Sequence, residues 1–197
     1  MKYLLGIDFG GSSSKATLLG EDGQVYATAS REYPTYYEHN GWAEQDADDS
    51  YDAMVGNIRQ ILSDTGIAPE DIAALALDAA THTAVLVGAG DRPVRRAIYW
   101  TDSRSSAQAA RLKAEMGNAL LEECYNGVSS LWTLPQFIWL RENEPEVLEK
   151  TRKVFAVKDY VRWRLTGDFV TDSIEAMGFL LLDARKNRWS QHLCDLA

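Results

Sequence analysis

Apolar residues near the start of the chain fall into two runs separated by a short polar segment. The first run ends at Phe9, the second begins at Ala16, and residues 10–15 read Gly-Gly-Ser-Ser-Ser-Lys. Apolar runs of this length, interrupted by glycine, predict two strands joined by a tight turn. A second turn at 21–23 and a segment rich in Val, Tyr, Ala and Thr over 24–33 extend the prediction to a three-stranded antiparallel meander.

The pattern then changes from a period of two to a helical period. Residues 34–49 are polar and aromatic without periodicity and predict a surface loop. Apolar side chains recur on one helical face between 51 and 62; Asp48, Asp49 and Ser50 are suitable N-caps, and Gly66 is a suitable end. The near-continuous apolar run over 72–79 predicts a strand buried on both faces.

Further along, strands and helices continue to alternate. The pattern predicts a short strand over 97–100, a helix from about 105 to 116 with Gly117 as its stop, a helix over 131–142, a strand over 154–157 and a helix over 158–167. No internal repeat, linker or low-complexity tract interrupts this order. The chain is therefore expected to be one α/β unit.

Bulk properties exclude several classes of protein. The chain has 197 residues, 46% of them hydrophobic and 25% charged, as in ordinary globular domains. Its net charge of −9, with no compensating basic stretch, argues against a nucleic-acid partner. Two cysteines without a C-x-x-C motif favour reduced thiols and a cytoplasmic location. No signal segment is evident, and no run reaches the about 18 apolar residues of a membrane span.

The first turn carries the clearest candidate chemistry. Gly10 and Gly11 let the backbone turn tightly, so that successive N–H groups can form a concave anion nest. Ser12, Ser13 and Ser14 add hydroxyl donors, and Lys15 adds positive charge. Asp8 precedes the turn, and a carboxylate facing a phosphate requires a cation between them, which suggests Mg²⁺.

The alternative interpretation is a hairpin turn without a ligand, since Gly-Gly-Ser turns are common. Two familiar phosphate motifs are excluded by the spacing. No G-x-x-x-x-G-K-[ST] is present, and no helical pattern follows the glycines as a dinucleotide fold requires.

The segment from Gly6 to Lys15 resembles the first phosphate motif of the actin/hexokinase/Hsp70 superfamily. Downstream segments resemble one branch, the FGGY carbohydrate kinases, and within it xylulokinase-like members. The resembling segments are Gly41 to Asp46, Thr81-His82-Thr83, Trp100 to Arg104, Lys158 to Gly167 and Thr171 to Gly178. The resemblance implies a ribonuclease H-like fold with a mixed sheet that opens with the antiparallel meander and carries helices on both faces.

The resemblance also implies a reaction, phosphoryl transfer from ATP to a hydroxyl of a small sugar or polyol, with Mg²⁺. Xylulose and ribulose are the expected pentuloses. Residues 1–197 would form the N-terminal domain, incomplete and without the second, ATP-binding domain. The family's catalytic Asp would lie beyond Ala197, so no catalytic base is assigned in this chain, which is expected to be inactive alone. A homodimer remains an open alternative.

Residue by residue, the resemblance assigns Gly10, Gly11, Ser12, Ser13 and Lys15 to phosphate binding and Asp8 to the metal. His82, Trp100 and Asp102 would orient the sugar. Trp42 and Arg104 are expected to be structural, and Trp132 either closes over the substrate or packs in the core.

Alternatives remain for some of these residues. A lone histidine such as His82 is often structural, and Asp102 could instead cap a helix. Thr81 and Thr83 replace the Met and Gly that usually flank this histidine, so the sugar stays open. A second hypothesis for the whole chain is a non-catalytic, sugar-responsive regulator or a degenerate kinase half.

Overall fold

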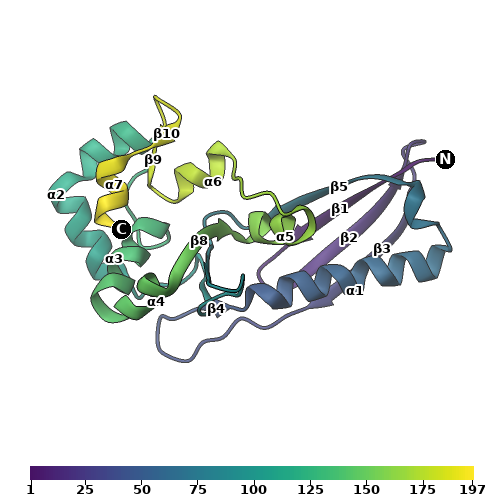
Figure 1. The fold of residues 1–197 in the computed structure, drawn as a ribbon, viewed down its shortest axis with the longest axis horizontal. Coiled ribbons are helices and arrows are strands. Elements are labelled where there is room, and N and C mark those ends of the chain that lie inside the picture. Colours follow the sequence, from purple (N-terminus) through teal and green to yellow (C-terminus); the bar gives the residue numbers. More distant parts are fainter.

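The computed structural model describes residues 1–197 and shows an elongated molecule with two lobes (Figure 1). The N-terminal lobe contains the main sheet and helix α1 (Ala47–Thr65). The other lobe contains most of the remaining helices and the C-terminus. Each lobe has its own cluster of buried apolar side chains, so two small cores stabilise the fold rather than one.

The main sheet has four strands in the order β3-β2-β1-β5. They are β1 (Tyr3–Phe9), β2 (Ser13–Gly20), β3 (Val25–Glu32) and β5 (Ile72–Ala79). The first three pair antiparallel, whereas β1 and β5 pair parallel. The predicted meander and the mixed α/β sheet are therefore confirmed.

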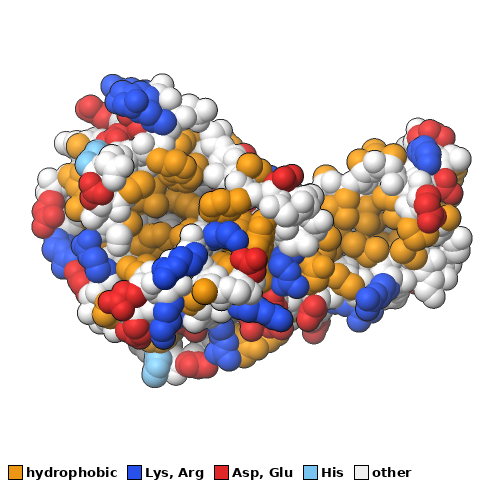
Figure 2. All heavy atoms as spheres, in the orientation of Figure 1, with side chains coloured by type: hydrophobic (Ala, Val, Ile, Leu, Met, Phe, Trp, Pro, Cys, Tyr) orange, Lys and Arg blue, Asp and Glu red, His pale blue; other side chains and the backbone are white.

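Only one face of this sheet is covered. Burial alternates strictly along β1, with Leu5 and Ile7 buried and Leu4 and Asp8 exposed. Helices α1 and α5 (Val157–Thr166) pack on the buried face, where they form one core with β1 and β2. The helices expected on both faces are thus found on one face only. Figure 2 shows apolar side chains gathered on the surface of this lobe.

The prediction that residues 72–79 are buried on both faces is wrong. β5 is the edge strand, and most of its residues are exposed, with Leu75 38% accessible. Its apolar composition fits a central strand of a parallel sheet, which needs a neighbour on each side. Within residues 1–197 it has a neighbour, β1, on one side only.

Capping residues set the limits of α1. The N-cap is Asp46, whose side chain accepts from the Asp48 N–H at 3.0 Å, so the helix begins earlier than expected from Asp48, Asp49 and Ser50. The acidic residues of the first turn interact favourably with the helix dipole. Gly66 ends the helix in the left-handed conformation, with φ of 68°, as predicted.

The second core lies among helices and short strands of the other lobe. These are β6 (Ala84–Gly88), α2 (Ser106–Cys124), α3 (Thr133–Asn143), α4 (Pro145–Lys150), β8 (Thr151–Ala156), α6 (Ser173–Gly178), β9 (Leu182–Asp183), β10 (Arg188–Trp189) and α7 (Gln191–Leu196). β6 pairs antiparallel with β8. The predicted stop at Gly117 is wrong, because α2 kinks at Met116 and continues. No helix combines the length and apolar character needed to cross a membrane.

A buried ion-pair network joins the loop after β3 to the segment before α2. β4 (Glu44–Gln45) pairs with β7 (Ala97–Ile98), and the Arg104 side chain, 1% exposed, lies against both Glu44 and Asp102. Its Nη2 is 2.8 Å from a carboxylate oxygen of each. The guanidinium also stacks on Trp42 at 3.7 Å, so the structural roles expected for Arg104 and Trp42 are confirmed.

Replacing Arg104 by Gln is expected to destabilise the fold strongly. The change leaves the Asp102 carboxylate, whose side chain is fully buried, without its cation, and breaking a buried pair in this way costs about 3–5 kcal/mol. Urea unfolding followed by circular dichroism measures the loss. Arg185→Gln, at an exposed arginine, is the matched control and should change stability by less than about 0.5 kcal/mol. Equal stability of the two variants would contradict the role given to the network.

Candidate active site

The Gly-Gly-Ser bend follows β1, and three polar side chains donate hydrogen bonds to its carbonyl oxygens. Tyr33 Oη donates to the Gly10 carbonyl at 2.6 Å. Thr35 Oγ1 and Gln45 Nε2 donate to the Gly11 carbonyl at 2.9 and 2.8 Å. With their carbonyls engaged on one side, the two peptide units are fixed in orientation, and their N–H groups point away from those donors.

The N–H groups of Gly11 and Ser12 have no acceptor within the protein, whereas the Gly10 N–H donates to the Ser13 carbonyl at 2.9 Å. Two free neighbouring N–H groups form the concave donor arrangement that binds anions. Neither glycine has a positive φ. Gly11 is required for another reason, because a Cβ there would lie 2.9 Å from Tyr99 Oη.

Charged side chains stand beside the bend on the open face of the sheet. In the register of β1 and β2, Asp8 lies opposite Lys15, and both are exposed. Across the parallel pair, Asp8 lies beside Asp78 of β5. The Asp8 carboxylate takes part in none of the ion pairs of the protein, so its oxygens are free to accept a ligand.

The His82 turn lies next to the bend. β1 and β5 are adjacent parallel strands, and their last residues, Phe9 and Ala79, are partners in the register. The Ala80 N–H reaches the Phe9 carbonyl at 3.4 Å. Both segments therefore leave the sheet at the carboxyl ends of neighbouring strands, the position at which α/β sheets bind ligands.

The backbone of His82 is held on every side. It adopts a left-handed conformation with φ of 52°, which is uncommon for a residue other than glycine. Its N–H donates to Glu175 Oε2 at 2.8 Å, and its carbonyl accepts from Thr133 Oγ1 at 2.9 Å. Gly178 leaves the necessary space, since a Cβ there would lie 2.9 Å from the His82 Cβ.

The His82 imidazole is buried and neutral. Its Nδ1 is 2.7 Å from Thr81 Oγ1, and the Trp132 ring lies 4.6 Å away, centroid to centroid. Burial lowers the pKa of His82 to about 4. Nε2 is buried without any hydrogen-bond partner. A buried nitrogen without a hydrogen-bond partner costs free energy of folding, so the ring is suited to a ligand that supplies the missing partner.

The other two residues predicted to bind the sugar, Trp100 and Asp102, differ in exposure. Trp100 is 39% exposed, and its ring centroid lies 5.9 Å from that of Tyr99, whose hydroxyl stands next to Gly11. The expectation that Asp102 contacts the sugar is contradicted. Its carboxylate is fully buried, pairs with Arg104, and accepts the Ala43 N–H at 2.6 Å, which leaves no oxygen free for a ligand.

Three residues that the sequence analysis did not assign to the site support His82 directly. They are Thr133 at the start of α3 and Glu175 and Gly178 of α6. The segment from Thr171 to Gly178 entered the sequence analysis only as part of the family resemblance, without a role in the site. No pattern joins Glu175 to His82, because 93 residues separate them and only the packing of α6 brings them together.

Comparison with known proteins gives a consistent result. Residues 3–197 match the family model described as the FGGY family of carbohydrate kinases, N-terminal domain. The chain is 34% identical to the xylulose kinase of Bacillus subtilis and 33% identical to the glycerol kinase of Polaromonas naphthalenivorans, matching 99% and 100% of its own length. The alignments cover 39% and 41% of those enzymes, so the chain spans about two fifths of the length of the curated relatives it matches.

Solved structures resemble the fold closely. A xyloylose kinase from Brucella ovis superposes with a TM-score of 0.90 at 32% identity, over 99% of this chain and 41% of that one. Ligand-bound xylulose kinase from Lactobacillus acidophilus gives 0.93 at 26% identity, over 100% and 40%. These structures and a gluconate kinase, with a TM-score of 0.92, are carbohydrate kinases with the actin/hexokinase-like fold.

Acid is expected to weaken the fold through His82. Its folded-state pKa of about 4 lies below the pKa of 6.5 of an unperturbed histidine, so the unfolded chain binds more protons between these limits. Stability therefore falls as pH drops from about 6.5 to about 4, by about 2 kcal/mol once partial solvent access is allowed for. Urea unfolding at several pH values should show a shallower fall in His82→Asn than in the exposed-histidine control His39→Asn. Parallel profiles would contradict this assignment.

Removing the Glu175 carboxylate is expected to release the His82 turn. Glu175→Ala leaves the buried His82 N–H without an acceptor, which costs about 1–3 kcal/mol. Glu175→Gln keeps an acceptor oxygen and should lose less. Amide hydrogen exchange at His82 and urea unfolding measure both effects. If exchange at His82 is as slow in the alanine variant as in the wild type, the bond does not hold the turn.

Proposed function

Because the chain belongs to the FGGY family of carbohydrate kinases, we propose that the protein transfers the terminal phosphoryl group of ATP to a hydroxyl of a small sugar or polyol. A pentulose such as xylulose or ribulose is the proposed acceptor, as two of the named relatives are xylulose kinases. Residues 1–197 would be the sugar-binding part of a larger two-domain enzyme. Such catalysis depends mainly on positioning and on charge stabilisation.

One observation carries this proposal. The two free N–H groups at Gly11 and Ser12 stand at the end of β1, and the unpartnered Nε2 of His82 stands after the end of its parallel neighbour, β5. The first is suited to a phosphate and the second to a hydroxyl, so the two reacting groups of a sugar kinase would meet at one sheet edge.

At the bend, the transferring phosphate would accept from the Gly11 and Ser12 N–H groups. Gly10 gives the bend its shape, the Ser12 and Ser13 hydroxyls can add donors, and Lys15 supplies a positive charge on the same face. Oxyanions are stabilised strongly by donors that are fixed before the reaction begins.

A magnesium ion fits the neighbouring carboxylates. Mg²⁺ is commonly held by one or two carboxylates together with waters and substrate phosphates. Asp8, with Asp78 beside it, offers this donor set on the open face. No group of three or more metal-ligating side chains occurs in the structure, so waters and the phosphates of the nucleotide would have to supply the remaining ligands. When bound, the ion would neutralise charge on the phosphates.

The sugar would lie between the bend and His82. The neutral imidazole can donate to or accept from a sugar hydroxyl at Nε2, depending on which ring nitrogen carries the proton. The exposed Trp100 indole would cover the carbon face of the sugar, as aromatic rings commonly do. Trp132 contacts His82 and would border the same space.

Kinetics of the full-length protein test the proposal. A coupled ADP-release assay with xylulose, ribulose, gluconate and glycerol should show turnover with at least one pentulose. His82→Ala should raise the sugar KM by about tenfold or more, because a sugar hydroxyl loses its partner, while the ATP KM changes little. His39→Ala, at an exposed histidine outside the site, is the matched control.

Two results would count against this assignment. Equal changes in both KM values would remove His82 from the sugar site. Sugar binding without ADP release from the full-length protein would instead favour the alternative, a non-catalytic regulator that responds to a sugar.

A further inference from the structure

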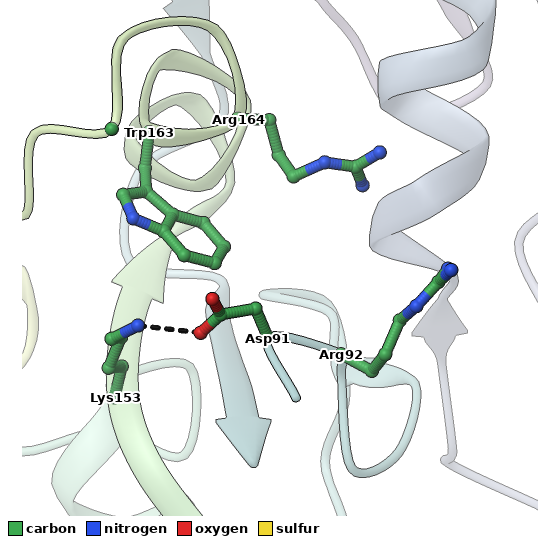
Figure 3. A pocket seen from close by; sticks show the side chains of 6 residues that line it. Asp91, Arg92, Lys153, Trp163 and Arg164 are labelled. Atoms are coloured by element: carbon green, nitrogen blue, oxygen red, sulfur yellow. Dashed lines mark hydrogen bonds and ion pairs between the residues drawn. The ribbon is translucent and has the colours of Figure 1, made fainter. Parts of the chain in front are cut away.

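A hollow lies away from the His82 turn, and charged side chains line it (Figure 3). We name it the Arg92 hollow; its volume is about 550 Å³. Asp91 and Arg92 come from the loop after β6, Lys153 from β8, and Trp163, Arg164 and Gly167 from the C-terminal end of α5. Three elements distant in sequence thus place three cations around one depression.

We propose that the Arg92 hollow binds the phosphate group of a small phosphorylated molecule. The site is independent of the kinase reaction proposed above. Its volume falls within the range of about 300–1,000 Å³ that small-molecule sites occupy.

Charge is the first support. Lys153 Nζ pairs with Asp91 Oδ1 at 2.6 Å, and Arg164 Nη1 with Asp48 Oδ1 at 2.7 Å. Arg92 Nη1 stands 4.0 Å from Asp48 Oδ2, beyond hydrogen-bond reach, and its side chain is 77% exposed. Three cations therefore share two carboxylates, and the uncompensated charge is at Arg92. In a chain with a net charge of −9, this local excess is unusual.

The directions of the side chains are the second support. In Figure 3 the side chains of Arg92 and Arg164 extend toward the same side of the hollow. Guanidinium groups donate in a planar fork that matches phosphate oxygens. An anion at the Arg92 guanidinium would accept from donors that form no hydrogen bond within the protein, while Arg164 keeps its contact with Asp48.

The wall of the hollow is rigid. Trp163 stacks on Phe155 with ring centroids 4.9 Å apart, and Lys153 Nζ lies 4.6 Å from the Trp163 ring centroid. Gly167 ends α5 with φ of 80° and adds no side chain to the opening. A fixed aromatic wall beside a cationic edge suits a phosphate attached to a small organic body, and five of the six lining residues are polar or glycine.

The hollow is distinct from the candidate active site. His82 precedes β6 (Ala84–Gly88), and Asp91 and Arg92 follow it. The two sites therefore lie at opposite ends of this strand, which at about 3.3 Å per residue separates them by about 15 Å. A ligand in the hollow would not compete with the sugar for His82.

Nuclear magnetic resonance of the ¹⁵N-labelled chain tests the proposal with inorganic phosphate at constant ionic strength. Saturable shifts are expected at the amides of Arg92, Lys153 and Gly167. Shifts at Gly11 and Ser12 would report the bend and are fitted separately. Arg92→Gln should weaken binding at the hollow about tenfold through the lost charge-assisted hydrogen bonds, and should leave the bend unchanged. Arg92 makes no side-chain hydrogen bond, so the variant should keep its fold.

Arg185→Gln is the matched control, since Arg185 is also exposed and forms no ion pair; its affinity should stay within twofold of wild type. Acetate, titrated in parallel, should bind at least tenfold more weakly than phosphate. Shifts that do not saturate, or equal affinities in Arg92→Gln and Arg185→Gln, would overturn the site. Equal binding of acetate would overturn its assignment to phosphate.

Discussion

The parallel pairing of β1 with β5 is the constraint on which the candidate site depends. Parallel neighbours end at the same edge of a sheet, so the turns that follow them meet although they are far apart in sequence. One turn presents free backbone N–H groups and the other a buried imidazole. Neither feature alone indicates a kinase, but their adjacency makes phosphoryl transfer to a hydroxyl a coherent proposal.

Around this pairing, hydrogen bonds fix the carbonyls of the bend and the backbone of the His82 turn, while two backbone N–H groups and one side-chain nitrogen remain without partners. The side chains of Tyr33, Thr35 and Gln45 fix the bend by donating to its carbonyls. Glu175 and Thr133 fix the His82 turn. The groups without partners, the Gly11 and Ser12 N–H and His82 Nε2, are those that would meet a substrate. Preorganisation of this kind lowers the cost of binding, because little must be ordered when the ligand arrives.

The Asp102–Arg104–Glu44 network has a different purpose from the one that its motif suggested. A buried carboxylate with its cation and a backbone donor has no capacity left for a sugar hydroxyl. It instead fixes the segment that carries Tyr99 and Trp100, and so holds the proposed aromatic wall beside Gly11. Asp102 therefore affects the site by fixing the position of this segment, not by contacting the sugar itself.

The meander, most helices and the bend could be predicted from the residues alone, because hydrophobic period and glycine placement are local properties. His82 was indicated by the family resemblance, which also supplied its proposed role. The burial of Asp102, the edge position of β5 and the contact of Glu175 with His82, 93 residues away, became visible only in the folded chain. Burial and partner choice depend on which elements pack together, and no local pattern in the chain encodes that.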